Sequence, residues 1–228
     1  MEVNTQTGDG ARDDRAASGA RKRETYHHGS LREELIDACV RLIEAEGIGA
    51  VSLRRVAREA GVSPGAPYHH FPDRAALLSA ISARGFEILA QDLAAAVAHP
   101  PGTPGPDDVA RAVAAYVAFA RRQSGHFQIM FRPELSQPEK HPAVREAGDA
   151  ALKVVTDLVD ELGIADPQAL AIALWALAHG LASLTLDGQI AHIAANWSTE
   201  GDDLLARALG QVGRSLDVVT EPGANTTP

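Results

Sequence analysis

The chain has 228 residues, of which 45% are hydrophobic and only 4% aromatic, and its formal net charge at pH 7 is -9. This length suits one large domain or a small domain joined to a medium one, and a single cysteine excludes an internal disulfide. Alanine is abundant while aromatic residues are few, which favours closely packed helices over a sheet. We therefore predict an all-α protein.

The negative charge is unevenly distributed along the chain. Residues 1–25 are neutral, with five basic and five acidic side chains, and residues 26–79 carry a net charge of -1, from six basic and seven acidic side chains. Residues 80–228 hold the remaining -8. Phosphate contacts supply most of the affinity of DNA-binding proteins, so any basic surface that binds nucleic acid is expected in the N-terminal third.

The sequence shows no sign of secretion, membrane insertion or metal binding. Its N-terminus is polar, and no stretch reaches the roughly 20 apolar residues of a membrane span, so we expect a cytoplasmic protein. Cys39 falls on the apolar face of a predicted helix, which indicates a buried structural thiol, with a redox sensor as the alternative. No cysteine and histidine spacing indicates zinc, so we expect neither a metal nor a cofactor.

The N-terminal region begins with a predicted disordered tail, residues 1–25, which lacks apolar periodicity. Ser30 and Glu33 have the spacing of a capping box, so a first helix should begin at Ser30. Gly47 should end this helix as a left-handed cap. The apolar stripe of the helix consists of Leu31, Leu35, Ala38, Cys39, Leu42 and Ile43.

Two short helices are predicted next. The first follows an N-cap at Ser52 and stops at Gly61, and the second has Ser63 as its N-cap and Pro64 at its first position. Two short helices joined through Gly61 and Val62 form a helix-turn-helix, whose second helix enters the major groove of DNA. An ordinary helical corner is the alternative.

The rest of the chain is predicted to be helical as well. Asp73 can cap a longer helix that runs to about Ala98, and residues 99–106, with four prolines and two glycines, should form a loop. Further helices are predicted at 107–124, 125–132, 142–162, 166–187 and 201–216. The expected domains are a helix-turn-helix domain over 26–79, a larger helical domain over 80–218, and a flexible tail over 219–228.

The segment from Ser52 to Leu78 carries a dense set of motifs. In order, these are the Ser52 cap, Arg54, Ala60-Gly61-Val62-Ser63, Tyr68, His70-Phe71 and Ala76-Leu77-Leu78. This set resembles the helix-turn-helix and following turn of the TetR family of transcriptional regulators. The segment Tyr26-His27-His28-Gly29-Ser30-Leu31 also resembles the entry to the first helix in one branch of that family, so the resemblance covers about a quarter of the chain.

The resemblance implies a set of DNA-contacting residues. In the family, the tyrosine and histidine that match Tyr68 and His70 contact the DNA backbone, and the position of His69 reaches bases or phosphate. Arg74 stands where the family usually has a lysine that contacts phosphate, and it keeps the charge. The complete predicted set is Ser52, Arg54, Arg55, Ser63, Pro64, Gly65, Ala66, Tyr68, His69, His70 and Arg74.

Pro67 is a departure from the family pattern, in which many members carry leucine. It removes a backbone donor near the start of the recognition helix, so this helix is expected to bend or fray. Few long polar side chains are then available to read base edges, and specificity would rest on His69, Arg54 and DNA shape.

The C-terminal domain contains a helix, predicted over 166–187, that is apolar nearly all round and therefore must be covered on more than one side. Trp175, His179 and Gly180 resemble the Trp-x-x-x-His-Gly signature of a subgroup of TetR-like C-terminal domains. The family dimerises through a four-helix bundle from its last two long helices, so a homodimer through 166–187 and 201–216 is expected.

Large side chains in this domain are candidates for a small-molecule effector pocket, although each of them also suits a hydrophobic core. These candidates are Tyr116, Phe119, Phe127, Met130, Phe131, Trp175 and His179.

The predicted function is therefore a repressor rather than an enzyme. An effector bound in the C-terminal domain would favour a dimer whose recognition helices no longer match the spacing of double-stranded operator DNA. Two alternatives remain open. One is a helical interaction module with a degenerate helix-turn-helix, which Pro67 favours, and the other is a small histidine-dependent enzyme, although no carboxylate and histidine spacing repeats along one helix.

Overall fold

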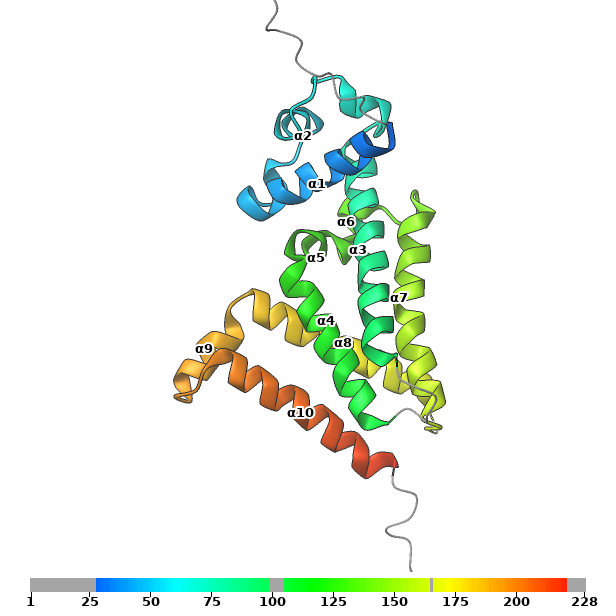
Figure 1. Ribbon diagram of the computed structural model, residues 1–228, viewed down its shortest axis with the longest axis vertical. Helices are drawn as coiled ribbons and strands as arrows, with labels where there is room; N and C mark the ends of the chain where they lie inside the picture. Colours follow the sequence, from blue (N-terminus) through cyan, green and yellow to red (C-terminus); the bar gives the residue numbers. More distant parts are fainter. Residues whose placement is uncertain (1–27, 99–104, 165, 221–228) are drawn as a thin grey trace, which may run out of the picture.

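The computed structural model describes residues 28–98, 105–164 and 166–220, and all regular structure within these ranges is helical (Figure 1). The all-α prediction is therefore confirmed. In chain order the helices are α1 (His28–Glu46), η1 (Ile48–Ala50), α2 (Leu53–Glu59), η2 (Ala66–His69), α3 (Arg74–Val97), α4 (Pro106–Arg122), α5 (Ser124–Met130), α6 (Pro133–Ser136), α7 (Pro142–Glu161), α8 (Pro167–Leu186), α9 (Gln189–Asn196) and α10 (Gly201–Thr220).

Helix α3 belongs to two hydrophobic cores. Leu77 and Ile81, in its first half, are buried with α1 and α2, whereas Phe86, Leu89 and Leu93 are buried in a second core with α4, α7 and α8. Along its length α3 lies beside α7, which supports the second core (Figure 1). The expected boundary between the two domains therefore falls within one continuous helix.

Helix α1 differs from its prediction at both ends. It begins at His28, so Ser30 lies inside the first turn and is not the N-cap that was expected. At the other end Gly47 has a φ of 81°, which agrees with a positive-φ residue, but its ψ of 169° is extended rather than left-handed helical. This ψ directs the chain into η1 instead of closing the helix with a left-handed cap.

The apolar stripe of α1 is buried as expected, because its members recur at helical spacing on the side that faces α2 and α3. Cys39 has no exposed surface, and burial raises the pKa of its thiol to about 12. A thiol held in its protonated form is a poor nucleophile, which supports the structural interpretation.

The later helices match their predictions closely, with two exceptions. The single turn of α6 and the short helix α9 were not predicted. Helix α9 begins after Gly188, whose φ is 72°, and ends at Asn196 before a turn that includes Ser198 at a φ of 53°. The last helix, α10, extends to Thr220 and includes the first two residues of the predicted tail, while residues 1–25 and 221–228 lie outside the described ranges.

Helix α8 is covered on one side only. Ala171, Leu174 and Ala178 are buried against neighbouring helices, which include α4 and α7, whereas Ile172 and Leu177 are exposed. By length and composition alone this helix is long and apolar enough to cross a membrane. The expectation that its apolar surface is covered on more than one side is not met within one chain.

Helix α5 joins the two halves of the molecule. At its start, the hydroxyl of Ser124 and the N–H of Gly125 both donate to Oε1 of Glu44 on α1, each at 3.2 Å. A Cβ atom on Gly125 would lie 2.9 Å from a methyl carbon of Val40, so only glycine allows α5 to approach α1 this closely. Local sequence patterns did not indicate this contact, because Ser124 and Glu44 are 80 positions apart.

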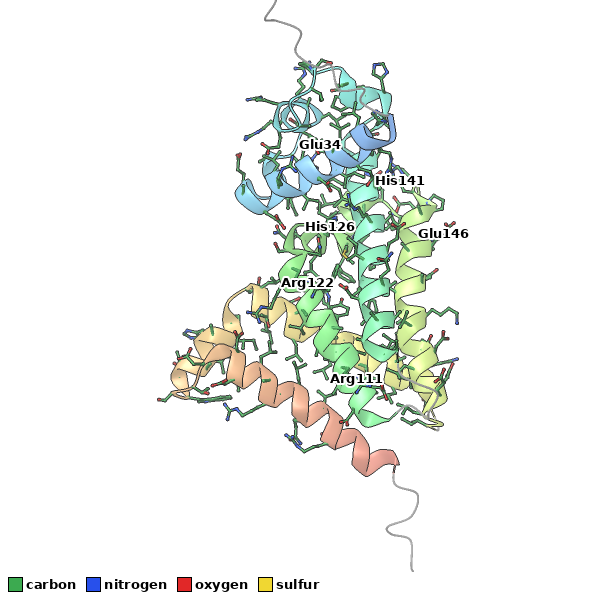
Figure 2. The ribbon with its side chains drawn as sticks, viewed as in Figure 1. Glu34, Arg111, Arg122, His126, His141 and Glu146 are labelled. Carbon is green, nitrogen blue, oxygen red and sulfur yellow. The ribbon has the colours of Figure 1, made fainter. Side chains whose placement is uncertain are left out.

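His126, the next residue on α5, is buried at this junction between α1, α3 and α5 (Figure 2). Neither ring nitrogen has a hydrogen-bond partner among the described residues. Burial lowers the pKa of His126, and repulsion from Arg84 lowers it further, while Glu44 and Asp37 oppose the shift. His126 is therefore neutral in the folded protein at pH 7, and its unpartnered atoms are a cost to stability.

We predict that His126→Leu stabilises the protein at pH 7 by about 1 kcal/mol, because it removes two unpaired polar atoms from the interior. Unfolded histidine titrates near pH 6.5, so the wild-type unfolded state gains a proton below this pH before the folded state does. The free energy of unfolding should fall as the pH drops below 6.5, and less steeply in the variant. Thermal unfolding at pH 7.5, 6.5 and 5.5 measures both effects.

The matched control is His192→Leu, since His192 is exposed on α9. This control should keep the wild-type pH dependence of stability. Equal pH dependence in His126→Leu and the wild type would contradict the conclusion that His126 is neutral in the folded protein.

Candidate nucleic-acid interface

Helix α2 has a polar face in solvent and, on its opposite side, a buried apolar face. Its N-cap is Ser52, whose hydroxyl accepts a hydrogen bond from the N–H of Arg55 at 3.3 Å, as predicted. Val56 and Ala57 are fully buried, so Arg54 and Arg58 on the opposite side extend into solvent. Their guanidinium groups have no ion-pair or hydrogen-bond partner in the described part of the chain. They are therefore available to phosphate.

The predicted recognition helix is shorter and tighter than expected. It is the four-residue 3-10 helix η2, and Ser63 and Pro64 precede it in a turn, so neither has the predicted capping or first-turn position. Pro67 has no N–H to donate to Ser63, and the carbonyl of Ser63 instead accepts from Ala66 at 3.0 Å. With Pro67 in place, the segment forms 3-10 hydrogen bonds, which span three residues, instead of α-helical ones. A helix of four residues has only a small dipole, so it does not provide the phosphate-binding helix N-terminus that was expected.

The side chains of η2 are divided between interior and solvent. Pro67 is buried, while Tyr68 keeps 51% of its surface exposed and His69 is also exposed. His70 is half-buried next to the fully enclosed Phe71. The buried residues hold η2 on the domain, and this leaves the tyrosine and one histidine free to contact DNA.

The remaining predicted DNA residues lie on the same part of the molecule with different exposures. Those exposed to solvent are Ser52, Ser63, Pro64 and Gly65. Those partly buried are Arg55, Ala66 and Arg74.

Arg74, at the start of α3, has an internal role that the sequence did not predict. Its Nε donates to the carbonyl of Val51 at 3.0 Å, and one terminal nitrogen donates to the carbonyl of Ile48 at 2.9 Å. The side chain thus joins α3 to the segment between α1 and α2. Its contact with phosphate stays a prediction, because two of its three nitrogens already have partners within the domain.

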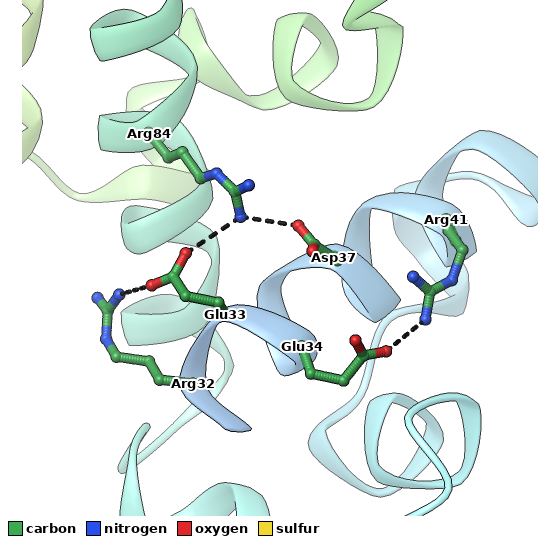
Figure 3. Close-up of polar contacts among 6 residues, drawn as sticks. All are labelled: Arg32, Glu33, Glu34, Asp37, Arg41 and Arg84. Atoms are coloured by element: carbon green, nitrogen blue, oxygen red, sulfur yellow. Dashed lines mark hydrogen bonds and ion pairs between the residues drawn. The ribbon is translucent and has the colours of Figure 1, made fainter. Parts of the chain in front are cut away.

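A set of ion pairs surrounds α1 (Figure 3). Arg84 on α3 bonds Asp37 at 2.7 Å and Glu33 at 3.2 Å, and Arg41 bonds Glu34 at 2.9 Å. Beyond this view, Arg55 pairs with Glu46. Four acidic side chains of α1 are therefore balanced locally by arginines, whereas Glu44 accepts hydrogen bonds from α5.

Five of the seven predicted effector residues form a ring cluster in the C-terminal domain: Tyr116, Phe127, Phe131, Trp175 and His179. The hydroxyl of Tyr116 lies 3.1 Å from Nδ1 of His179, and the centroid of Phe131 lies 4.4 Å from that of the imidazole. Phe127 stacks on the imidazole at 5.3 Å, and Trp175 meets Tyr116 edge-on at the same distance. Burial lowers the pKa of His179, so this ring is neutral at pH 7.

Two cavities adjoin this cluster. Between α3, α4, α7 and α8 an apolar cavity of about 10 Å³, bordered by Tyr116 and Trp175, has room for roughly one water molecule. A cleft of about 610 Å³ lies at the surface and is lined in part by Phe127, Phe131 and His179. Phe119 and Met130 line neither cavity and are buried in the core of the C-terminal domain. Of the seven candidates, these two are therefore best explained as core residues.

Comparison with known families gives matches in both halves of the chain. The model for bacterial regulatory proteins of the tetR family matches residues 35–81, and the model for a tetracyclin repressor-like C-terminal domain matches residues 109–212. Among curated proteins, the HTH-type transcriptional regulator BetI of Brucella anthropi is 41% identical over 66 residues, which are 29% of this chain and 34% of that protein. AcrR of Shigella flexneri is 40% identical over 50 residues, 22% of this chain and 23% of AcrR.

Solved structures match over most of the chain, whereas the curated relatives are matched over about a third of their length or less. A protein of unknown function from Rhodococcus sp. RHA1 is 31% identical, with a TM-score of 0.67 and coverage of 84% of this chain and 98% of that one. The TetR family transcriptional regulator PfmR from Thermus thermophilus has a TM-score of 0.57 at 16% identity, covering 86% of this chain and 98% of its own. This second likeness concerns the fold alone.

We predict that Arg74→Lys lowers the stability of the protein by about 2 kcal/mol although it keeps the charge, because lysine cannot bond both carbonyls with a rigid fork. Thermal unfolding measures this loss, and Arg58→Lys, at an exposed position without a described partner, is the matched control. A wild-type melting temperature for Arg74→Lys would show that the internal bonds contribute nothing.

Proposed function

The chain belongs to the TetR family of transcriptional regulators, and we propose that it binds operator DNA through α2 and η2 to control transcription. The observation that carries this proposal is the side-chain arrangement of the helix-turn-helix. Tyr68, His69 and Arg54 are exposed on elements whose apolar residues, including Val56 and Pro67, are buried. A rigid framework that presents a phenol, an imidazole and a guanidinium suits contacts to the DNA backbone.

The charge pattern supports the same proposal despite the acidic chain. Arg41, Arg55 and Arg84 pair with carboxylates of α1, so these acids contribute little net charge near the interface. Arg54 and Arg58 remain free to displace counterions from phosphate. Binding is therefore expected to weaken steeply as the salt concentration rises.

We predict that Tyr68→Ala weakens operator binding about tenfold, equivalent to roughly 1.4 kcal/mol, because it removes a phosphate or sugar contact. Its melting temperature should stay at the wild-type value, since the side chain is half exposed. A gel-shift titration with a duplex from the upstream region of its own gene measures the affinity. Tyr68→Phe keeps the ring and separates the contribution of the hydroxyl.

An exposed residue outside the interface provides a further control. Arg145 lies on α7 without a described partner, so Arg145→Ala should bind as the wild type does, whereas Arg54→Ala should reduce the salt dependence of binding. Wild-type affinity and salt dependence in both Tyr68→Ala and Arg54→Ala would refute the proposed interface.

We further propose that two copies associate through α8 and α10 to form the DNA-binding dimer. Leu177 and Leu184 are large apolar side chains exposed on α8 seven residues apart, so they share one face of the helix, and such a face suits burial against a second copy. A twofold dimer also places two helix-turn-helix units on a palindromic operator. Within this dimer, an effector bound to the C-terminal domain would release the operator by favouring a different spacing of these units.

Leu177→Glu is expected to convert the dimer to a monomer, because the partner would have to bury an unpaired carboxylate. Sedimentation velocity measures the change. Ala150→Glu, which places the same charge on an exposed position of α7, should leave the dimer intact. A dimeric Leu177→Glu variant with wild-type stability would exclude this face as the interface.

A further inference from the structure

The cleft of about 610 Å³ at the surface of the C-terminal domain has a floor of aromatic rings. It lies between α5 with the turn that follows it and the second half of α8. Phe131 and His179 are only half-buried, and both line the cleft. Aromatic rings that keep exposed faces or edges favour a further ring against them, so a planar aromatic molecule suits this floor.

His179 supplies the polar group of the floor. Its Nδ1 is engaged by the hydroxyl of Tyr116, whereas Nε2 has no partner among the described residues. Because burial keeps the imidazole neutral, Nε2 is either a donor or an acceptor, depending on the direction of the Tyr116 bond. A hydroxyl group can both donate and accept, so a hydroxylated ligand satisfies Nε2 in either tautomer.

The rim of the cleft carries opposite charges that offset one another. Arg132 and Asp187 are both exposed there, and neither side chain has an ion-pair partner in the described part of the chain. Gln128 and Ser183 add uncharged polar groups to the lining. An ionised ligand would lose hydration in the cleft without meeting an excess of opposite charge, so the lining favours an uncharged molecule.

We propose that this cleft binds uncharged aromatic molecules that carry a hydroxyl group, with the ring against Phe131 and His179 and the hydroxyl on Nε2 of His179. The volume lies within the range of small-molecule sites. That such a ligand acts as the effector rests on the regulatory function proposed above.

Equilibrium dialysis of the full chain at pH 7 tests the ligand class with four related probes. These are 1-naphthol, naphthalene, 1-naphthoate and 1-naphthylmethylamine, which share one ring system and differ in the polar group. We expect 1-naphthol to bind about fivefold more tightly than each of the other three, the factor that one hydrogen bond of ordinary net strength contributes. Equal affinities for all four probes would overturn the proposal.

Two variants test the site itself. His179→Phe keeps a ring but removes Nε2, so the affinity for 1-naphthol should fall to that for naphthalene, while naphthalene binding is retained. Phe131→Leu should weaken the binding of both probes, and it also keeps the test valid if His179→Phe does not fold. Trp197→Phe, at an exposed aromatic residue outside the cleft, should bind 1-naphthol as the wild type does. Wild-type binding of 1-naphthol in folded His179→Phe and Phe131→Leu would overturn the site.

A gel-shift assay with and without 1-naphthol separates this proposal from the proposed function. Release of operator DNA by 1-naphthol in the wild type, but not in His179→Phe, is the expected result. If 1-naphthol does not bind while operator binding persists, the cleft proposal fails and the DNA-binding function stands. If 1-naphthol binds but the protein binds no operator, the regulatory function fails and the binding site stands.

Discussion

The shared helix α3 is the constraint on which the rest of the structure depends. Its first half packs in the core of the helix-turn-helix through Leu77 and Ile81, and its second half packs in the body through Phe86 and Leu89. Because these contacts lie on one hydrogen-bonded helix of 24 residues, the two cores cannot move independently without bending or displacing it. The hydroxyl of Ser79 adds a further connection, since it donates to the carbonyl of Ser136 at 2.6 Å.

The ion pairs around α1 decide which arginines can act outside the protein. A surface ion pair contributes little to stability, and at most about 1 kcal/mol, so these pairs are not what holds the domain together. Their effect is electrostatic: Arg41 and Arg84 offset carboxylates of α1, Arg74 bonds backbone carbonyls, and Arg54 and Arg58 remain unpaired among the described residues. An acidic chain can therefore present a locally basic surface on α2.

Helix α5 contacts α1 of the helix-turn-helix domain and contributes Phe127 to the ring cluster. Gly125 and His126 face the junction with α1 and α3, while Phe127 stacks on His179 of α8. A molecule bound against His179 is thus separated only by the side chain of Phe127 from α5, the helix that also contacts α1. The unpartnered nitrogens of His126 make this junction less stable than an apolar one. Moving α5 away from α1 therefore costs less free energy than it would at a fully apolar junction.

The sequence by itself determined the features that depend on residues within about four positions of one another. The Ser52 and Asp73 caps, the apolar stripe of α1 and most helix bounds were predicted correctly, because cap bonds and helical periodicity are local. The short form of η2 was local too, but the sequence interpretation treated Pro64 as a helix start and underestimated Pro67.

Only the tertiary structure decided which side chains are available for function. The bonds of Arg74 to carbonyls 23 and 26 residues away, the approach of Gly125 to α1, and the separation of Phe119 from the ring cluster all depend on how helices pack. Periodicity shows that a residue is apolar or polar on its own helix, but it does not say which neighbour that helix meets. That choice follows from the simultaneous packing of the helices around the two cores.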